Sequence, residues 1–157
     1  MIRHEVLELK EQKYVGIKTT ILFKDADKVD FSQLHKDVHA ANISNIDHHE
    51  HMMAMDTDFT ESSFSYTPLV PVHSYDHNER YTQFTRKQGT YYAFEVKASE
   101  LNPVWFKNVF EYFKEKRITI ENTGYDLEYY EENYSAMING SDVLTERVLK
   151  ILFKMQS

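Results

Sequence analysis

Residues 89–97 read Gly-Thr-Tyr-Tyr-Ala-Phe-Glu-Val-Lys, and about 77 residues earlier residues 14–19 read Tyr-Val-Gly-Ile-Lys-Thr. Each segment is followed by apolar residues at helical spacing, over 29–42 in the first half and 104–116 in the second. Each half then closes with aromatic or aliphatic segments that are typical of strands. A repeated order of elements constrains the architecture of a whole chain. The sequence therefore predicts two similar strand–helix–strand units in one pseudo-twofold domain, with a cleft at the seam between them.

The first half predicts a strand, a helix and a hairpin in that order. Residues 6–20 place apolar side chains among charged neighbours, which is typical of a long strand. Apolar residues over 31–41 follow helical spacing, and Asp30 just before them is expected to cap the helix. Residues 52–57 and 64–72 have the character of two hairpin arms joined by a polar turn.

Two prolines lie in the second arm of this predicted hairpin. Proline has no N–H to donate to a neighbouring strand, so it is usually confined to edge strands or strand ends. Pro68 and Pro71 therefore predict that the arm 64–72 lies at the edge of the sheet or ends there.

The second half repeats this order. Strands are expected on both sides of a turn at 87–89, and Pro103 is placed where the first turn of a helix accepts proline. Residues 126–130 predict a short strand, Asn139-Gly140 a tight turn, and 147–155 the closing strand. The predicted class is α+β, a pseudo-twofold pair of βαββ units whose antiparallel sheet carries two main helices.

Composition limits the functions that the chain can have. Its 157 residues suit one domain, 1–157, with halves of roughly 1–75 and 76–157. The net charge of −7 disfavours direct binding of nucleic acid, and no apolar run reaches the length of a membrane span. The N-terminus lacks the apolar core of a signal peptide, and zero Cys excludes disulfides and thiolate chemistry. We expect a cytoplasmic protein without a cofactor.

Three segments of the second half resemble the GyrI-like effector-binding family. They are the strand 89–95, the helix opened by Pro103 and Trp105, and the strand 124–130 with its Leu-Glu-Tyr-Tyr motif at 127–130. The family includes the ligand-binding domains attached to AraC- and MerR-type transcription regulators, and the resemblance extends over essentially the whole chain. It implies a central groove that accepts small, often cationic or aromatic, organic molecules. No helix-turn-helix pattern precedes the domain, so we expect a stand-alone version without a DNA-binding domain.

The resemblance implies that Glu128 projects into this groove. A carboxylate among tyrosines would pair with a cationic ligand, and the aromatic ring faces would add cation–π attraction. The residues alone leave open a solvated strand position beside buried Leu127. The predicted ligand-binding residues are Glu128, Tyr130, Tyr92, Phe94, Trp105, Tyr14 and Gly16.

Several of these residues have a structural alternative. Trp105 begins a helix beside other aromatic residues, and large aromatic side chains most often pack in the core. Tyr14 and Gly16 are the first-half counterparts of the second-half strand. Gly16 would leave room for a ligand, or it would mark a bulge or a close approach of the backbone.

The cluster His48, His49, Glu50 and His51 has residue types that bind metals. On a strand, His49 and His51 would share one face, which suits chelation. A metal site usually also needs a distant third ligand with an oriented second shell, and nothing in the sequence places one nearby. We therefore predict no metal site, and expect a polar loop or the start of a strand.

Three functions follow from these observations. The first is a binding module for a hydrophobic small molecule, with organic cations among the candidates, linked to transcription regulation or to the sensing of toxins and drugs. The second is a hydrolase of reactive small molecules in which Glu128 is the general base. The third is an inhibitor of a DNA-handling enzyme whose acidic surface imitates nucleic acid. We favour the binding module, because the sequence shows no matched nucleophile and base; a protein partner is not identified.

Overall fold

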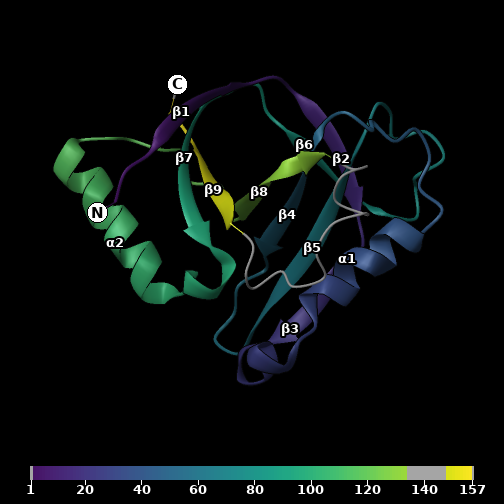
Figure 1. The fold of residues 1–157 in the computed structure, drawn as a ribbon, viewed down its shortest axis with the longest axis horizontal. Coiled ribbons are helices and arrows are strands. Elements are labelled where there is room, and N and C mark those ends of the chain that lie inside the picture. Colours follow the sequence, from purple (N-terminus) through teal and green to yellow (C-terminus); the bar gives the residue numbers. More distant parts are fainter. Residues whose placement is uncertain (1, 134–147, 157) are drawn as a thin grey trace.

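The computed structural model describes residues 2–133 and 148–156. This part of the chain contains two α-helices, α1 (Phe31–Ala40) and α2 (Pro103–Lys116), and two 3-10 helices, η1 (Phe23–Lys28) and η2 (Ala98–Glu100). Its strands are β1 (Glu5–Leu9), β2 (Gln12–Gly16), β3 (Thr19–Leu22), β4 (His51–Thr57), β5 (Ser63–Val72), β6 (Thr82–Arg86), β7 (Gly89–Lys97), β8 (Asp126–Asn133) and β9 (Val148–Lys154). They form one antiparallel sheet in the order β1-β7-β9-β8-β4-β5-β2-β6, with β3 paired to β5 (Figure 1). The predicted α+β class is confirmed.

The two halves exchange their first strands. Strand β1 pairs with β7 of the second half, from Glu5 opposite Ala93 to Leu9 opposite Gly89. Strand β6 of the second half pairs in turn with β2 of the first half. Because β1 and β6 start 77 residues apart, at positions 5 and 82, and β2 and β7 do likewise, at positions 12 and 89, the exchange is reciprocal. The predicted pseudo-twofold arrangement is therefore present, and each half completes the sheet of the other.

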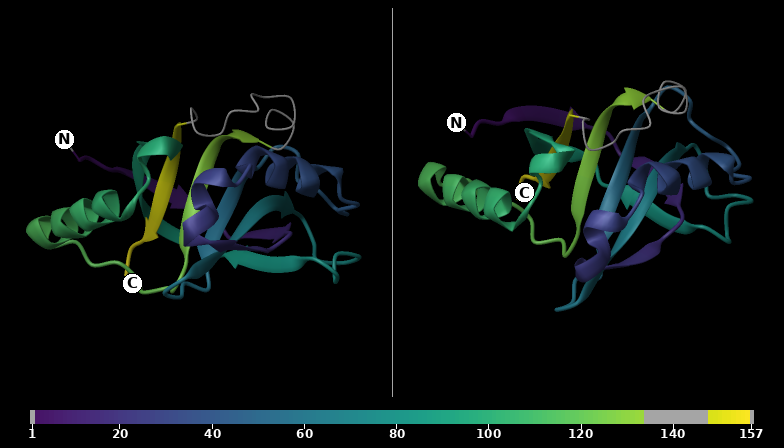
Figure 2. Two further views of the ribbon diagram at one scale, coloured as in Figure 1. Left: turned by 90° about the horizontal axis from the view of Figure 1, so that it is seen from below. Right: turned by 60° about the horizontal axis from the view of Figure 1, so that its bottom comes forward.

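The halves also meet at the centre of the sheet, where β4 pairs with β8. The sheet is curled (Figure 2). Two hydrophobic clusters lie on its opposite faces. One cluster includes Val38 of α1 and Val109 and Phe113 of α2, and we call its side of the sheet the helical face. The other cluster contains buried residues of strands alone, among them Tyr14 and Leu127, and we call its side the opposite face. Figure 1 shows α1 and α2 on either side of the central strands.

Both helices begin at side-chain caps. The carboxylate of Asp30 accepts a hydrogen bond from the Gln33 backbone N–H at 3.1 Å, which confirms the predicted cap. Asn102 caps α2 in the same way, through a 3.0 Å bond from the backbone N–H of Trp105, and proline occupies the first helical position. The start of each helix is therefore determined by local sequence.

The prediction that the arm 64–72 is an edge strand is wrong, whereas its alternative, that the arm ends there, is confirmed, because β5 ends at Val72 directly after Pro71. Strand β5 is an interior strand that pairs with β4 on one side, and with β3 and then β2 on the other. Pro68 lies between Tyr66, the last residue paired with β3, and Leu69, the first paired with β2. Proline lacks a backbone N–H, and Pro68 lies at the point where the neighbouring strand changes from β3 to β2. The sheet tolerates a missing hydrogen-bond donor at this point.

The remaining boundaries differ from the predictions by a few residues. The predicted long strand over 6–20 is divided into β1, β2 and the start of β3. The closing strand β9 spans Val148–Lys154. The predicted turn at Asn139-Gly140 lies outside the described residues. Within the described part of the chain, no helix combines the length and the apolar composition that crossing a membrane would require.

Candidate functional site

Three carboxyl groups lie together on the helical face of the central strands. Strand β4 pairs with β8 so that Ala54 is opposite Glu128 and Asp56 is opposite Asp126. Side chains alternate along a strand, so Leu127 turns to the opposite face while Asp126 and Glu128 share the helical face. Glu128 is only 7% exposed. The pairing thus places Asp56, Asp126 and Glu128 close together at the seam between the two halves.

A line of hydrogen bonds connects Glu128 to helix α1. The Tyr130 hydroxyl donates to Glu128 Oε1 at 3.2 Å, and the hydroxyls of Tyr66 and Tyr130 are 3.3 Å apart. His35 Nε2 lies 2.9 Å from the Tyr66 hydroxyl. Because each tyrosine has a single hydroxyl proton, donation to the carboxylate requires Tyr66 to donate to Tyr130 and His35 Nε2 to donate to Tyr66. All four side chains are buried.

Asp56 and Glu128 are neighbours on this face, because Ala54 of β4 lies opposite Glu128 and Asp56 is the next residue of β4 on the same face. Burial raises the pKa of Asp56 well above its usual range, and the charge of Glu128 adds to this rise. Burial also raises the pKa of Glu128, whereas the nearby Asp56 and the hydrogen bond from the Tyr130 hydroxyl act in the other direction. Burial and the charge of Glu128 raise the pKa of Asp126 to about 6.

No cationic side chain neutralises these carboxyl groups in the part of the chain that is described. The lysine and histidine ion pairs among the described residues involve other acids, such as Glu121 with Lys154 and Asp58 with Lys18. A buried carboxylate without a counter-charge is costly, because it has lost its water without gaining a partner. The site therefore presents negative charge that is incompletely compensated.

The structure brings some of the predicted ligand-binding residues together. Glu128 and Tyr130 are in direct contact. Tyr92, Phe94 and Trp105 lie on the same helical face, in the cluster around α2, where the Phe94 and Trp105 rings meet edge to face with centroids 6.4 Å apart. These three aromatic residues pack in or against the core, and their role in ligand binding stays a prediction.

Tyr14 and Gly16 are placed away from Glu128. Tyr14 belongs to the cluster on the opposite face, where its hydroxyl donates to the His51 carbonyl at 3.0 Å. A Cβ atom built at Gly16 would lie 2.1 Å from the Pro68 carbonyl oxygen. Gly16 thus allows two backbones to approach closely, and what occupies the space beside it is strand β5.

The histidine cluster is engaged in local contacts. His51 Nδ1 lies 2.8 Å from the Tyr130 carbonyl oxygen, and its ring stacks on Tyr129 with centroids 4.7 Å apart. The backbone N–H of His49 donates to an Asp47 carboxylate oxygen at 3.2 Å. Among residues 2–133 and 148–156, no group of three or more His, Asp or Glu side chains is arranged to hold a metal ion.

Reasoning from the sequence missed Asp56, Asp126, Tyr66 and His35 as members of this site. One local signal existed, since His35 falls on the apolar stripe of α1 with Val38, where a histidine is unusual. No local signal identified Asp56, which stands at the end of an apolar strand like many surface acids. Its place beside Glu128 depends on the pairing of β4 with β8, and strand pairing is a tertiary property.

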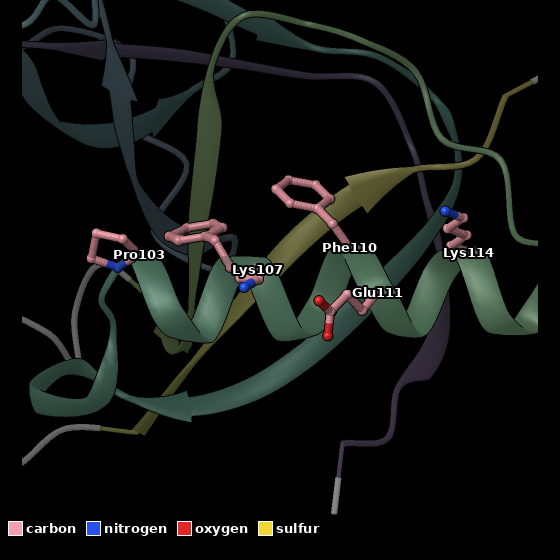
Figure 3. Close-up of a pocket in the computed structure, with 6 residues that line it drawn as sticks. Pro103, Lys107, Phe110, Glu111 and Lys114 are labelled. Carbon is pink, nitrogen blue, oxygen red and sulfur yellow. The ribbon is translucent and has the colours of Figure 1, made fainter.

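A separate hollow of about 540 Å³ lies along α2 (Figure 3). Its lining consists of Pro103, Phe106, Lys107, Phe110, Glu111 and Lys114. Phe110 is 49% exposed. The hollow is shallow and apolar with charged residues at its rim, and it contains none of the predicted ligand-binding residues.

Comparisons with known proteins bear on the fold. No family model matches the chain, and no curated protein matches it. The chain is similar to the solved structure of SAV2435 bound to tetraphenylphosphonium, at 13% identity and a TM-score of 0.65, over 99% of this chain and 94% of that one. It is similar to EcmrR in a complex with DNA, at 13% identity and a TM-score of 0.69, over 99% of this chain and 58% of that one. It is also similar to a putative bacterial transcription regulation protein from Staphylococcus aureus MU50, at 16% identity and a TM-score of 0.58, over the full length of both chains. At these identities the likeness shows that the chain shares the fold of these proteins, which is consistent with the predicted GyrI-like domain.

Proposed function

We propose that the protein is a GyrI-like effector-binding domain that binds a small lipophilic cation beside Glu128, on the helical face between α1 and α2. The observation that carries the proposal is the burial of Glu128 without a cationic partner in the described part of the chain. A bound cation would supply the missing counter-charge, and surrounding aromatic rings would favour an apolar ligand over a hydrated metal ion.

The surroundings of Glu128 support a selective site for positive charge. Its carboxylate is oriented by the Tyr130 hydroxyl, so little reorganisation is needed when a ligand arrives. An anionic ligand would meet Asp126 as well as Glu128, and like charges at close range repel. Neutral ligands would leave the buried carboxylate without a partner.

The similar structures support the same class of ligand. One of them, SAV2435, is bound to tetraphenylphosphonium, which is a large apolar monocation. Another, EcmrR, is in a complex with DNA, and this chain matches 58% of it. We infer that the present domain senses or sequesters a cationic toxin or drug.

The proposal is tested with two probes of the same shape and opposite charge. Tetraphenylphosphonium and tetraphenylborate are titrated against the protein by calorimetry, and the melting temperature is recorded with each. The cation is expected to bind and to stabilise the fold by about 2.7 kcal/mol at a hundred times its dissociation constant. The borate is expected to do neither.

A pair of matched variants assigns the site. Glu128→Gln keeps the shape of the side chain and removes the charge, so it is expected to lose most of the response to the cation. Glu95→Gln removes one negative charge from an exposed position on β7 and is expected to respond like the wild type. Equal responses in the two variants, or equal binding of the two probes, would refute the assignment.

A further inference from the structure

A histidine of α1 forms the far end of the hydrogen bonds that begin at Glu128. His35 is 3% exposed and lies on the apolar stripe of its helix with Val38. Its ring meets the rings of Tyr66 and Tyr130 edge to face, with centroids 6.0 and 5.5 Å apart. A buried imidazole is costly unless it is hydrogen-bonded, and an apolar side chain would fill this position without that cost. Packing alone therefore does not account for a histidine here.

These four polar side chains, which we call the hydrogen-bond line, connect the two halves of the chain. His35 of α1 and Tyr66 of β5 come from the first half, and Tyr130 and Glu128 of β8 come from the second. The three contacts between successive members measure 2.9, 3.3 and 3.2 Å. The line therefore crosses the seam at which β4 pairs with β8.

The charge of Glu128 sets the direction of donation along this line. An ionised carboxylate only accepts hydrogen bonds, so Tyr130 uses its single hydroxyl proton on Glu128. Tyr66 must then donate to Tyr130, and His35 must carry a proton on Nε2 to donate to Tyr66. A Glu128 protonated on the oxygen that faces Tyr130 would permit the opposite direction, in which both hydroxyls turn round. Nε2 of His35 would then accept, and the neutral imidazole would carry its proton on Nδ1.

The other neighbours of Glu128 leave the orientation of its carboxylate to the hydrogen-bond line. Directly opposite it lie two apolar residues, Ala54 of β4 and Ile151 of β9. The next side chains on the helical face, Asp56 of β4 and Asp126 of β8, are acids and offer it no positive charge. In the described part of the chain, the carboxylate is therefore oriented by the hydroxyl at the end of the line and not by an ion pair.

We propose that His35 is a positioning residue for Glu128, because the proton on its Nε2 fixes the direction of donation through the two tyrosines. This inference rests on the proposed function. Each hydrogen bond in such a line polarises the next, so a donor at its far end strengthens the bond to the carboxylate. A bound cation keeps Glu128 ionised and thereby keeps the proton of His35 on Nε2. Ligand binding at β8 is thus linked to the protonation of a residue on α1.

Substitutions along the line are expected to weaken the binding of tetraphenylphosphonium in a graded way. Tyr130→Phe removes the bond to the carboxylate itself and is expected to weaken binding by about tenfold. Tyr66→Phe acts one bond further away and is expected to weaken it by about threefold. His39→Leu removes another histidine of the same helix and is expected to bind like the wild type. Calorimetry gives the dissociation constants.

Two substitutions at position 35 separate positioning from packing. His35→Gln places an amide N–H near the position of Nε2, where it can donate to Tyr66, and is expected to bind within about twofold of the wild type. His35→Leu keeps an apolar side chain and removes the donor, so it is expected to weaken binding by about threefold. A leucine variant that binds like the wild type, or a glutamine variant that binds as weakly as the leucine variant, overturns the proposal.

The ring nitrogens of His35 report the same coupling without any ligand. In ¹⁵N-labelled protein, correlations between ring protons and ring nitrogens distinguish a protonated nitrogen from an unprotonated one. Nε2 of His35 is expected to be protonated in the wild type at neutral pH, and to stay so when tetraphenylphosphonium is added. In Glu128→Gln the Nε2-protonated population is expected to fall, because an amide can either accept from Tyr130 or donate to it.

These spectra decide the proposal even if a variant at position 35 fails to fold. A proton confined to Nδ1 in the wild type, or an unchanged distribution between the two nitrogens in Glu128→Gln, overturns it. If the wild type binds no cation, the proposed function fails, whereas the spectra still show whether His35 is coupled to Glu128.

Discussion

Asp126 offers a quantitative test of the electrostatics of the site. Burial and the charge of Glu128 raise its pKa from 3.8 to about 6. For an acid with a raised pKa, the folded state binds more protons than the unfolded state between these two pH values. Stability therefore decreases as pH increases through this window. The substitution Asp126→Asn removes this titration and keeps the size of the side chain.

The expected change in the free energy of unfolding follows from the size of this pKa shift. A difference of about two pKa units corresponds to about 3 kcal/mol as an upper limit, and solvent screening of this partly exposed side chain reduces the expected effect to about 1–2 kcal/mol. Asp126→Asn is therefore expected to be more stable than the wild type at about pH 7.5, and to gain much less at about pH 4. Urea unfolding at both pH values gives the free energies of unfolding.

The decisive quantity is the stability change caused by Asp126→Asn at the higher pH minus the change at the lower pH. This subtraction cancels any effect of the amide that does not depend on pH. Glu95→Gln, at an exposed position on β7, is the control for the loss of one negative charge. If Asp126→Asn changes the free energy of unfolding equally at both pH values, or destabilises the protein more at the higher pH, the electrostatic reasoning is wrong.

Three further predictions concern single positions. Burial lowers the pKa of His39 to about 4, so the contribution of this side chain to the free energy of unfolding is expected to fall by about 1–2 kcal/mol, after solvent screening, as pH drops from 6.5 to 4; His39→Leu should lack this contribution when its urea unfolding is compared with that of the wild type at the two pH values. Gly16→Ala is expected to destabilise the protein by about 2–4 kcal/mol, because the new Cβ atom would meet the Pro68 carbonyl oxygen at 2.1 Å; a melting temperature equal to that of the wild type would contradict this clash. Asn102→Ala removes the cap bond to the Trp105 backbone and is expected to cost about 1 kcal/mol in chemical unfolding, and an unchanged midpoint would show that the cap contributes nothing.

The stability cost of the acidic cluster and its proposed affinity for cations have the same origin. Burial raises the free energy of the ionised carboxylates at Glu128 and Asp126, and a bound cation would relieve part of it. Protons compete with the cation for these groups. Binding of tetraphenylphosphonium is therefore expected to weaken as pH falls through 6. The stabilisation of the fold by this ligand should be largest above that pH, where protons no longer compete for the carboxyl groups.

Much of the local structure was determined by the sequence itself. Both helices follow from apolar spacing and from cap residues such as Asp30 and Asn102, because these interactions connect residues three or four positions apart. The recurrence of similar segments 77 residues apart was enough to predict a pseudo-twofold α+β fold. The motif at 127–130 singled out Glu128, which the structure places in a buried polar cluster.

The tertiary structure alone decided how these elements are paired and which residues share a face. Alternation along a strand places Tyr14 and Gly16 on one face, but it does not tell which face of the sheet carries the helices. The exchange of first strands between the halves, and the interior place of Pro68 in β5, arise from contacts between distant segments. The same is true of Asp56, which becomes a neighbour of Glu128 only because β4 lies beside β8. Strand pairing is set by burial and backbone hydrogen bonding summed over the whole sheet, and no local stretch of the chain contains that information.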